Sequence, residues 1–166
     1  MSEKLTVKGD DKKWTEVAKK VINAIMDYAS KTGKFRTVRI GGHEVVDALP
    51  GFYIVFPNLD EQGRIAFHRT GHLFTFNCMY VMKGENFKEA LEELLEAHGA
   101  MLAKLDEDHD MAGVPKGVPE VGVPVVFDVD AVGLVLEVRA GQVAQSFEYL
   151  YGATEIRVKG KMNLRG

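Results

Sequence analysis

Apolar residues recur at steps of three and four along two stretches of the chain, and each stretch predicts an amphipathic helix. The first helix is expected over residues 11–32 and the second over residues 87–105. Asn86 followed by Glu89 forms a capping-box-like start for the second helix, whose outer face is acidic. The expected buried stripes are Trp14, Val17, Ala18, Val21, Ile25, Tyr28 and Ala29, then Phe87, Leu91, Leu94, Leu95, His98, Met101, Leu102 and Leu105.

The ends of the first helix carry their own signals. Asp10 or Asp11 is placed to cap its first turn, and Gly33 supplies a left-handed stop. After this stop, apolar and polar residues alternate over residues 37–40, which predicts a short strand.

Three further strands are expected in quick succession, over residues 52–56, 64–68 and 73–82. Short connections favour antiparallel hairpins, so these strands predict a meander. A two-residue loop at 70–71 would place Phe67 opposite Phe74, whereas a three-residue loop would place Phe67 opposite Leu73. We favour the two-residue loop, because it leaves one apolar and one mixed face.

The last third of the chain differs from the rest in its composition. Residues 106–124 begin with an acidic run and hold three Val-Pro steps, which predicts a long extended loop. Strands are expected over 125–129 and 133–139, a short helix over 142–151 and a last strand over 155–159.

These elements together predict one α+β domain over residues 1–166. Its antiparallel β-sheet, made of the meander and the C-terminal strands, is expected to pack against two long amphipathic helices and one short helix. Fold class alone does not decide what the protein does.

The composition is that of an ordinary globular protein, with 46% hydrophobic residues, 27% charged residues and a formal charge of -3. These values exclude a chain that is disordered throughout, and no apolar run is long enough for a membrane span. The N-terminus lacks the apolar centre of a secretory signal, so we expect a cytoplasmic protein. The single cysteine, Cys78, lies in an apolar strand and is expected to be a buried, inert thiol.

Charge is unevenly distributed along the chain. Residues 1–39 hold 10 basic and 5 acidic side chains, whereas residues 85–110 hold 2 basic and 9 acidic ones. The two surfaces could attract each other within one chain or between two copies, although two solvated helix faces are the simpler interpretation. The basic stretch is short and carries no aromatic-basic motif, so we expect no nucleic-acid partner.

Two histidine patterns resemble metal sites without completing one. His43 and Asp47 form an H-E-x-x-D segment, which is similar to the zinc-binding H-E-x-x-H, but no third ligand is clearly placed. His68 and His72 are four residues apart, and in the favoured hairpin register they point to opposite faces of the sheet, whereas the three-residue loop would place them opposite each other and allow a joint site. We therefore expect no metal and no other cofactor.

A polar patch near the strand turns is the best candidate for a ligand site. Its guanidinium and imidazole groups would suit an anion or a carboxylate. The residues expected to form it are Arg39, His43, Arg64, His68, Arg69 and His72. If the protein were an enzyme that depends on a small molecule or a metal, this patch would carry the chemistry.

The order helix, three-strand meander, helix, two strands and short helix over residues 11–151 resembles that of the small dimeric chaperones of type III secretion and their relatives. The resemblance leaves the strands at 37–40 and 155–159 unexplained. It implies a homodimer whose sheet face and helices bind an extended segment of a protein partner. On that resemblance, the partner-binding residues would be Phe52, Ile54, Phe56 and Leu73.

The sequence contains no convergent set of catalytic residues. It favours a non-catalytic module that works through protein–protein contact, with a homodimer as the expected assembly and a further protein partner as a possibility.

Overall fold

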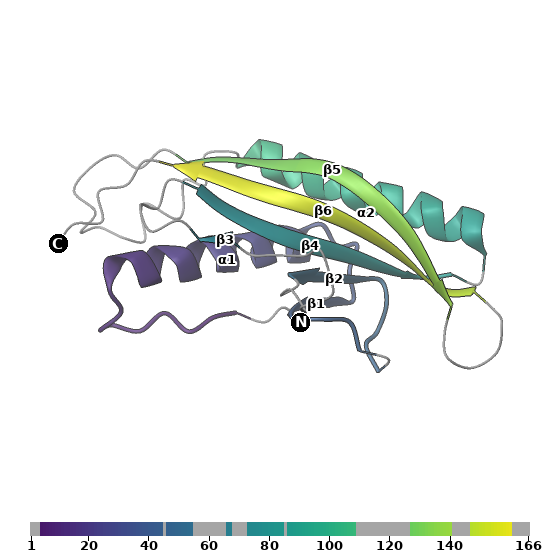
Figure 1. Ribbon diagram of the computed structural model, residues 1–166, viewed down its shortest axis with the longest axis horizontal. Helices are drawn as coiled ribbons and strands as arrows, with labels where there is room; N and C mark the ends of the chain where they lie inside the picture. Colours follow the sequence, from purple (N-terminus) through teal and green to yellow (C-terminus); the bar gives the residue numbers. More distant parts are fainter. Residues whose placement is uncertain are drawn as a thin grey trace.

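Figure 1 shows the computed structural model of the chain, which describes residues 4–44, 46–54, 66–67, 73–84, 86–108, 127–140 and 147–160. Most of the expected loop at 106–124 lies outside these ranges. The described elements are, in chain order, α1 (Lys13–Lys31), β1 (Thr37–Ile40), β2 (Gly51–Ile54), β3 (Ala66–Phe67), β4 (Leu73–Lys83), α2 (Phe87–Glu107), β5 (Phe127–Ala140) and β6 (Phe147–Gly160).

The strands form a mixed sheet in the order β1-β2-β4-β6-β5, and β3 pairs with β4 beside this path. β1 and β2 run parallel, with Val38 opposite Phe52, and the other described pairings are antiparallel. The predicted mixture of helices and a sheet is confirmed, but the prediction of a purely antiparallel sheet is wrong. The segment 41–50 carries the chain back to the start of β1, so β2 enters the sheet in the same direction as β1.

The expected meander is confirmed for the hairpin of β3 and β4 and wrong for the pairing of β2 with β3. β2 does not precede β3 in the sheet, because it pairs directly with β4, where Ile54 lies opposite Cys78. The favoured register of the next hairpin is confirmed, since Phe67 lies opposite Phe74 and Ala66 opposite Thr75. β2 and β3 thus pair with different parts of the long strand β4.

The C-terminal elements differ most from the prediction. The two strands expected between 125 and 139 are one strand, β5, which bulges near Gly133, where φ is 70°. The helix expected over 142–151 is wrong for residues 147–151, which begin β6, and residues 141–146 lie outside the described ranges. Tyr149 and Tyr151 are half-buried while Leu150 between them is fully buried. Burial therefore alternates from residue to residue, as it does in a strand.

The hydrophobic core lies between the helices and one face of the sheet (Figure 1). Alternate residues of each strand point into it, as a sheet covered on one face requires. In β4 these residues are Phe76, Cys78, Tyr80 and Met82, and all four are fully buried. The prediction that Cys78 is a core residue is therefore confirmed, and burial raises the pKa of its thiol.

The buried stripe of α2 is narrower than the one expected from the sequence. Leu94, Met101 and Leu105 are buried as predicted, but Phe87 and Leu95 are about half exposed. The remaining buried positions are alanines, Ala90 and Ala97. Small residues here let the helix approach the sheet closely, and the larger apolar side chains on one flank stay in contact with solvent.

The helix ends agree with the prediction at two of three places. Asn86 accepts a hydrogen bond from the Glu89 N–H at 3.3 Å, and Gly33 follows α1 with a φ of 69°. The expected cap on α1 is absent, because its N-cap is Lys12, which makes no side-chain cap. Asp11 instead accepts from the Lys8 N–H at 2.7 Å and binds the Lys19 ammonium at 2.8 Å.

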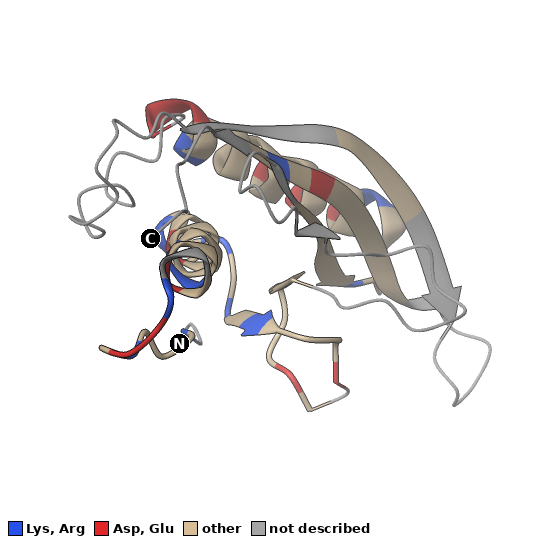
Figure 2. Ribbon diagram, turned by 60° about the vertical axis from the view of Figure 1, so that its left-hand side comes forward, with Lys and Arg blue, Asp and Glu red and all other residues tan. Residues whose placement is uncertain are grey.

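The basic and acidic stretches lie on different helices, and Figure 2 shows lysine positions on α1 and acidic positions along α2. Ion pairs within each helix, such as Lys20–Glu16 at 3.0 Å and Lys104–Glu107 at 3.3 Å, join residues that lie one helical turn apart. The Tyr28 hydroxyl of α1 donates a hydrogen bond of 2.5 Å to Asp108, which follows α2. No helix in the described part of the chain is long and apolar enough to cross a membrane.

Candidate functional site

The face of the sheet opposite the helices carries a polar and aromatic cluster. Tyr53 alternates with the core residues Phe52 and Ile54 in β2, and Tyr149 and Tyr151 flank the core residue Leu150 in β6. The tyrosines therefore point away from the helices. The segment 41–50 lies against them, and the Thr37 hydroxyl holds this segment by donating to the Ala48 carbonyl at 2.6 Å.

Arg39 and Asp47 form a two-pronged ion pair within this cluster. Arg39 Nη1 lies 2.7 Å from Asp47 Oδ1, and Arg39 Nη2 lies 2.6 Å from Asp47 Oδ2. Asp47 Oδ2 also accepts from the Tyr53 hydroxyl at 2.8 Å and from the Glu44 N–H at 2.9 Å. Burial opposes ionisation, but the donors Glu44, Tyr53 and Arg39 outweigh it and hold the pKa of Asp47 below its ordinary value.

The ring of Tyr53 lies against the backbone at the start of its own strand. A Cβ atom on Gly51 would come within 2.6 Å of this ring, so only glycine leaves room for it. The Arg39 guanidinium lies 5.5 Å from the centre of the same ring. Burial and the neighbouring Asp47 carboxylate raise the pKa of Tyr53, which keeps its hydroxyl a donor.

His43 sits among the three tyrosines. Its ring centre lies 4.9 Å from that of Tyr149, 5.8 Å from that of Tyr53 and 5.9 Å from that of Tyr151. Nδ1 shares a hydrogen bond of 3.0 Å with the Tyr151 hydroxyl, while Nε2 is buried and has no hydrogen-bond partner. Burial lowers the pKa of His43, Arg39 adds to this effect, and Asp47 opposes it.

This geometry does not suit a metal site at His43 and Asp47. Both carboxylate oxygens of Asp47 are occupied by protein donors, and the segment that holds the two residues is not helical. No group of three possible metal ligands occurs among the described residues. The cluster is a closed network that ties the 41–50 segment to β1, β2 and β6.

Of the ligand patch expected from the sequence, the structure brings Arg39 and His43 together. The other expected members, Arg64, His68, Arg69 and His72, lie outside the described residues. Sequence reasoning missed Tyr149 and Tyr151, because it assigned them to a helix. The signal that could have found them is the alternation of tyrosines with Leu150 and Gly152.

The residues expected to bind a partner are placed differently. Phe52 and Ile54 are fully buried beneath the helices, so a partner cannot reach them in this arrangement. Phe56 lies outside the described residues, and Leu73 is described as the first residue of β4.

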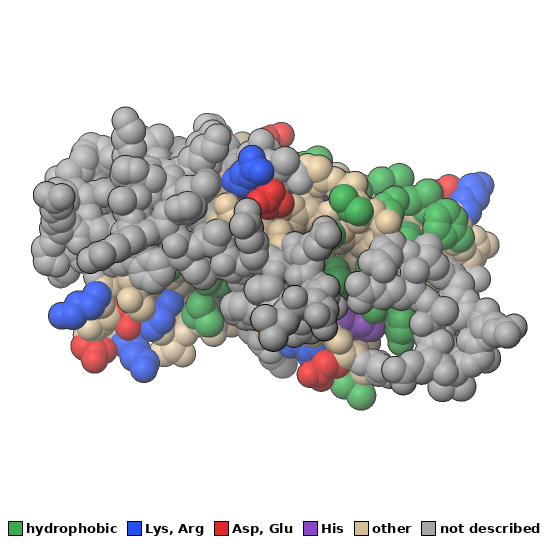
Figure 3. Space-filling model, viewed as in Figure 1, with side chains coloured by type: hydrophobic (Ala, Val, Ile, Leu, Met, Phe, Trp, Pro, Cys, Tyr) green, Lys and Arg blue, Asp and Glu red, His purple; other side chains and the backbone are tan. Residues whose placement is uncertain are grey.

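Four of the exposed apolar residues lie elsewhere, two in β5 and two in α2. Val135 and Leu136 are 70% and 42% exposed, and Phe87 and Leu95 are 49% and 50% exposed. Figure 3 shows hydrophobic side chains gathered at the right-hand end of the molecule. Val135 and Leu136 are adjacent in β5 and therefore point to opposite faces of the sheet, with Leu136 on the face that α2 covers. We call the four residues Phe87, Leu95, Val135 and Leu136 the β5 strip.

The position of Gly152 shows how the strand residues of the strip lie relative to α2. Leu136 lies opposite Gly152 in the sheet, and a Cβ atom on Gly152 would meet Leu94 at 2.9 Å. Leu136 therefore lies beside the turn of α2 that also carries Leu95.

The outer edge of β5 is long. β5 has 14 residues and pairs with β6 on one side, and none of the described strands pairs with its other side. β1, at the opposite end of the sheet, has only 4 residues. Unpaired edges of this length offer a row of free N–H and C=O groups to another strand.

Comparisons with known proteins leave the family open. The chain matches no protein-family model and shows no significant similarity to a curated protein. The resemblance to secretion chaperones rests on the order of elements, and it stays a prediction.

Proposed function

We propose that this protein is a non-catalytic interaction module that pairs with a second copy of itself through the outer edge of β5. The observation that carries the proposal is the exposure of Val135 and Leu136 on the longest free strand edge of the described sheet. A strand edge that also bears apolar side chains is the kind of surface that another strand covers.

A second copy is the occupant that this edge suits best. Two identical strands that pair antiparallel around a two-fold axis form an isologous contact, in which one surface complements itself. An axis at Val135 would place that residue opposite its own copy and Leu136 opposite Leu134 of the second chain. All of these residues are apolar, and the formal charge of -3 per chain gives little repulsion.

The dimensions support a stable contact. A strand of 14 residues extends over about 46 Å. Phe87 and Leu95 on α2 add apolar area beside this edge. Side-by-side pairing of the strands and the adjacent helices has room to bury the total of about 1,200 Å² that specific interfaces need.

Disulfide capture tests this arrangement. Residues directly opposite each other in an antiparallel pair have Cα atoms about 5 Å apart, which suits a disulfide. We expect V135C to form a covalent dimer under mild oxidation. V46C is the matched control, because Val46 is 87% exposed and lies outside β5, in the segment between β1 and β2. The native Cys78 is fully buried and does not compete.

Light scattering over a range of concentrations gives an independent readout. We expect the mass of a dimer for the unmodified chain. A monomer at every concentration, or equal cross-linking of V135C and V46C, would show that β5 does not pair with a second copy.

A further inference from the structure

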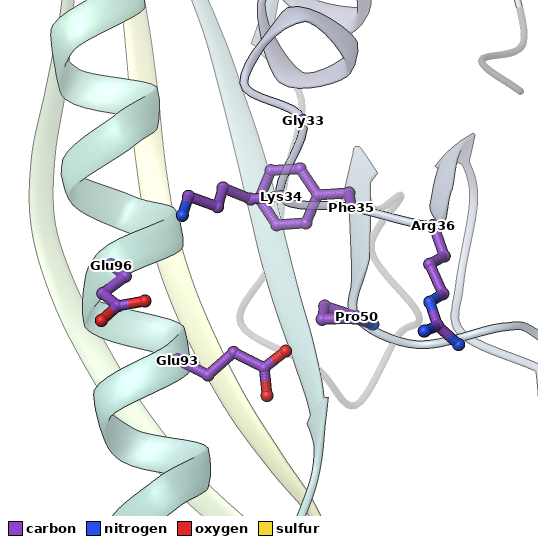
Figure 4. Close-up of a pocket in the computed structure, with 7 residues that line it drawn as sticks. All are labelled: Gly33, Lys34, Phe35, Arg36, Pro50, Glu93 and Glu96. Carbon is purple, nitrogen blue, oxygen red and sulfur yellow. The ribbon is translucent and has the colours of Figure 1, made fainter.

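A cleft of about 310 Å³ opens between the turn that follows α1 and the middle of α2 (Figure 4). Its size falls at the lower end of the range for small-ligand sites, about 300 to 1,000 Å³. It lies on the helix side of the sheet, opposite the face that carries His43, Tyr53, Tyr149 and Tyr151, which we call the tyrosine cluster. The lining residues are Gly33, Lys34, Phe35, Arg36, Pro50, Glu93 and Glu96.

Charges of opposite sign face each other across this cleft. Lys34 extends from the turn toward α2 on the side of Glu96, and Glu93 extends from α2 toward Pro50 (Figure 4). Arg36 lines the rim, with its guanidinium directed away from α2. Lys34, Glu93 and Glu96 are exposed, and none of them forms an ion pair within 4.0 Å in the described part of the chain.

Phe35 forms an apolar wall of the cleft, and residues of the hydrophobic core hold its ring in place. The Phe35 ring stacks on Tyr80 with 5.7 Å between ring centres and an angle of 6°, and it lies 5.6 Å from the Phe52 ring. The Tyr80 hydroxyl is itself anchored, because it shares a hydrogen bond of 2.8 Å with His98 Nδ1. Phe35 therefore presents a preformed surface, which reduces the ordering that a ligand must impose.

We propose that this cleft binds a free α-amino acid with an apolar side chain. Its ammonium group would lie by the carboxylates of Glu93 and Glu96, and its carboxylate by the Lys34 ammonium. Its side chain would pack on Phe35 and Pro50. A simple anion would meet two carboxylates and a simple cation would leave Lys34 unpaired, so a ligand with adjacent opposite charges fits best.

Titration of the isotope-labelled chain with L-phenylalanine and L-leucine tests the proposal by NMR. We expect saturable shifts of the Gly33, Phe35 and Glu96 amide signals. Blocking either charge should weaken binding about five-fold or more, because each charge makes its own charge-assisted contact. The blocked probes are N-acetyl-L-phenylalanine, which lacks the ammonium, and L-phenylalaninamide, which lacks the carboxylate.

Two substitutions test the same contacts from the side of the protein. E93Q and K34Q should each weaken binding about five-fold or more, whereas E92Q should leave it unchanged. Glu92 is an apt control, because it neighbours Glu93 and makes only a 4.0 Å ion pair with Lys88. The three side chains are exposed, so the amide spectrum should show that each variant keeps its fold.

Either of two results would overturn the proposal. One is the absence of saturable shifts for both amino acids up to about 10 mM. The other is equal binding of the free and the blocked probes. Failure of this test would not count against the proposed dimer, because the cleft and the β5 strip share no residue. A variant that abolishes pairing of two copies should still bind the amino acid.

Discussion

His43 and Tyr151 share a hydrogen bond of 3.0 Å that joins the segment after β1 to β6, 108 residues further along the chain. The other ring nitrogen of His43 is buried without a partner, so this bond is the one through which the imidazole is satisfied. Y151F should therefore lower the free energy of unfolding by about 1 to 3 kcal/mol, measured by urea denaturation. Y149F is the control, because the Tyr149 ring also contacts His43 whereas the hydrogen bond of His43 goes to Tyr151, so we expect a much smaller change. Equal losses would contradict the role of the Tyr151 hydroxyl.

Stability should fall as the solution becomes acidic. Burial lowers the pKa of both His43 and His98, so the folded chain binds protons less readily than the unfolded chain, whose histidines titrate near 6.5. The contribution of the neutral rings is fully present above pH 6.5 and is lost as pH falls through the lower pKa values of the folded state.

This pH dependence is measured from denaturation midpoints between about pH 8 and about pH 5. H43F removes one of the two groups, so its stability should decrease less on acidification than that of the unmodified chain. An unchanged slope would show that His43 does not contribute.

The ion pair between Arg39 and Asp47 should stabilise the fold far more than the neighbouring ion pair between Arg39 and Glu44 does. D47A removes the carboxylate that the partly buried Arg39 guanidinium and the Tyr53 hydroxyl share as an acceptor, so we expect a loss of about 2 kcal/mol or more. E44Q removes another carboxylate beside Arg39, but that one is 3.8 Å away and 67% exposed. Its loss should cost no more than about 0.5 kcal/mol. Calorimetric or urea unfolding of the two variants checks the contrast, and similar losses would contradict it.

Two glycine substitutions should act in opposite directions. A Cβ atom on Gly152 would lie 2.9 Å from Leu94 Cδ1, so G152A should destabilise the chain by about 1 to 3 kcal/mol. Gly99 lies inside α2 with nothing within 4 Å of an added Cβ. G99A should therefore stabilise the chain by about 0.5 to 1 kcal/mol through higher helix propensity. Thermal unfolding distinguishes the two signs, and a loss of stability in G99A would contradict the open position of Gly99.

A charge on the edge of β5 should prevent pairing of two copies. V135K places an ammonium where the proposed two-fold axis would bring two of them together. We expect this variant to be monomeric in light scattering at concentrations where the unmodified chain is a dimer. V46K adds the same charge outside β5, in the segment between β1 and β2, so it should still be a dimer. If V135K kept the dimer, the proposed interface would be wrong.

The helices and the hairpin register could be predicted because their signals are local. Leu94, Met101 and Leu105 follow a period of 3.6 residues, and the alternation around Phe67 and Phe74 allows one apolar face only in the observed register. The start of β6 was harder to predict. Phe147 and Leu150 fit a helical spacing as well as a strand, and the pairing of Phe147 with β5 and of Leu150 with β4 decided in favour of the strand.

The tyrosine cluster shows why the candidate site could be predicted only in part. Arg39, His43 and Asp47 lie within nine residues of one another, so the sequence alone drew attention to them. Tyr149 and Tyr151 reach the same place only because β6 lies beside β4, which in turn pairs with β2. No local pattern records such a contact.

By itself, the sequence determined where the two helices begin and end to within a few residues, that Cys78 is buried, and which face of the first helix is apolar. These properties follow from neighbours a few residues apart, whose spacing decides what they can bury. Only the tertiary structure decided that β1 and β2 are parallel, that Phe52 and Ile54 lie in the core, and that none of the described strands pairs with the outer edge of β5. Those properties depend on which distant strands pair, and pairing is decided by how all the apolar faces are covered at once.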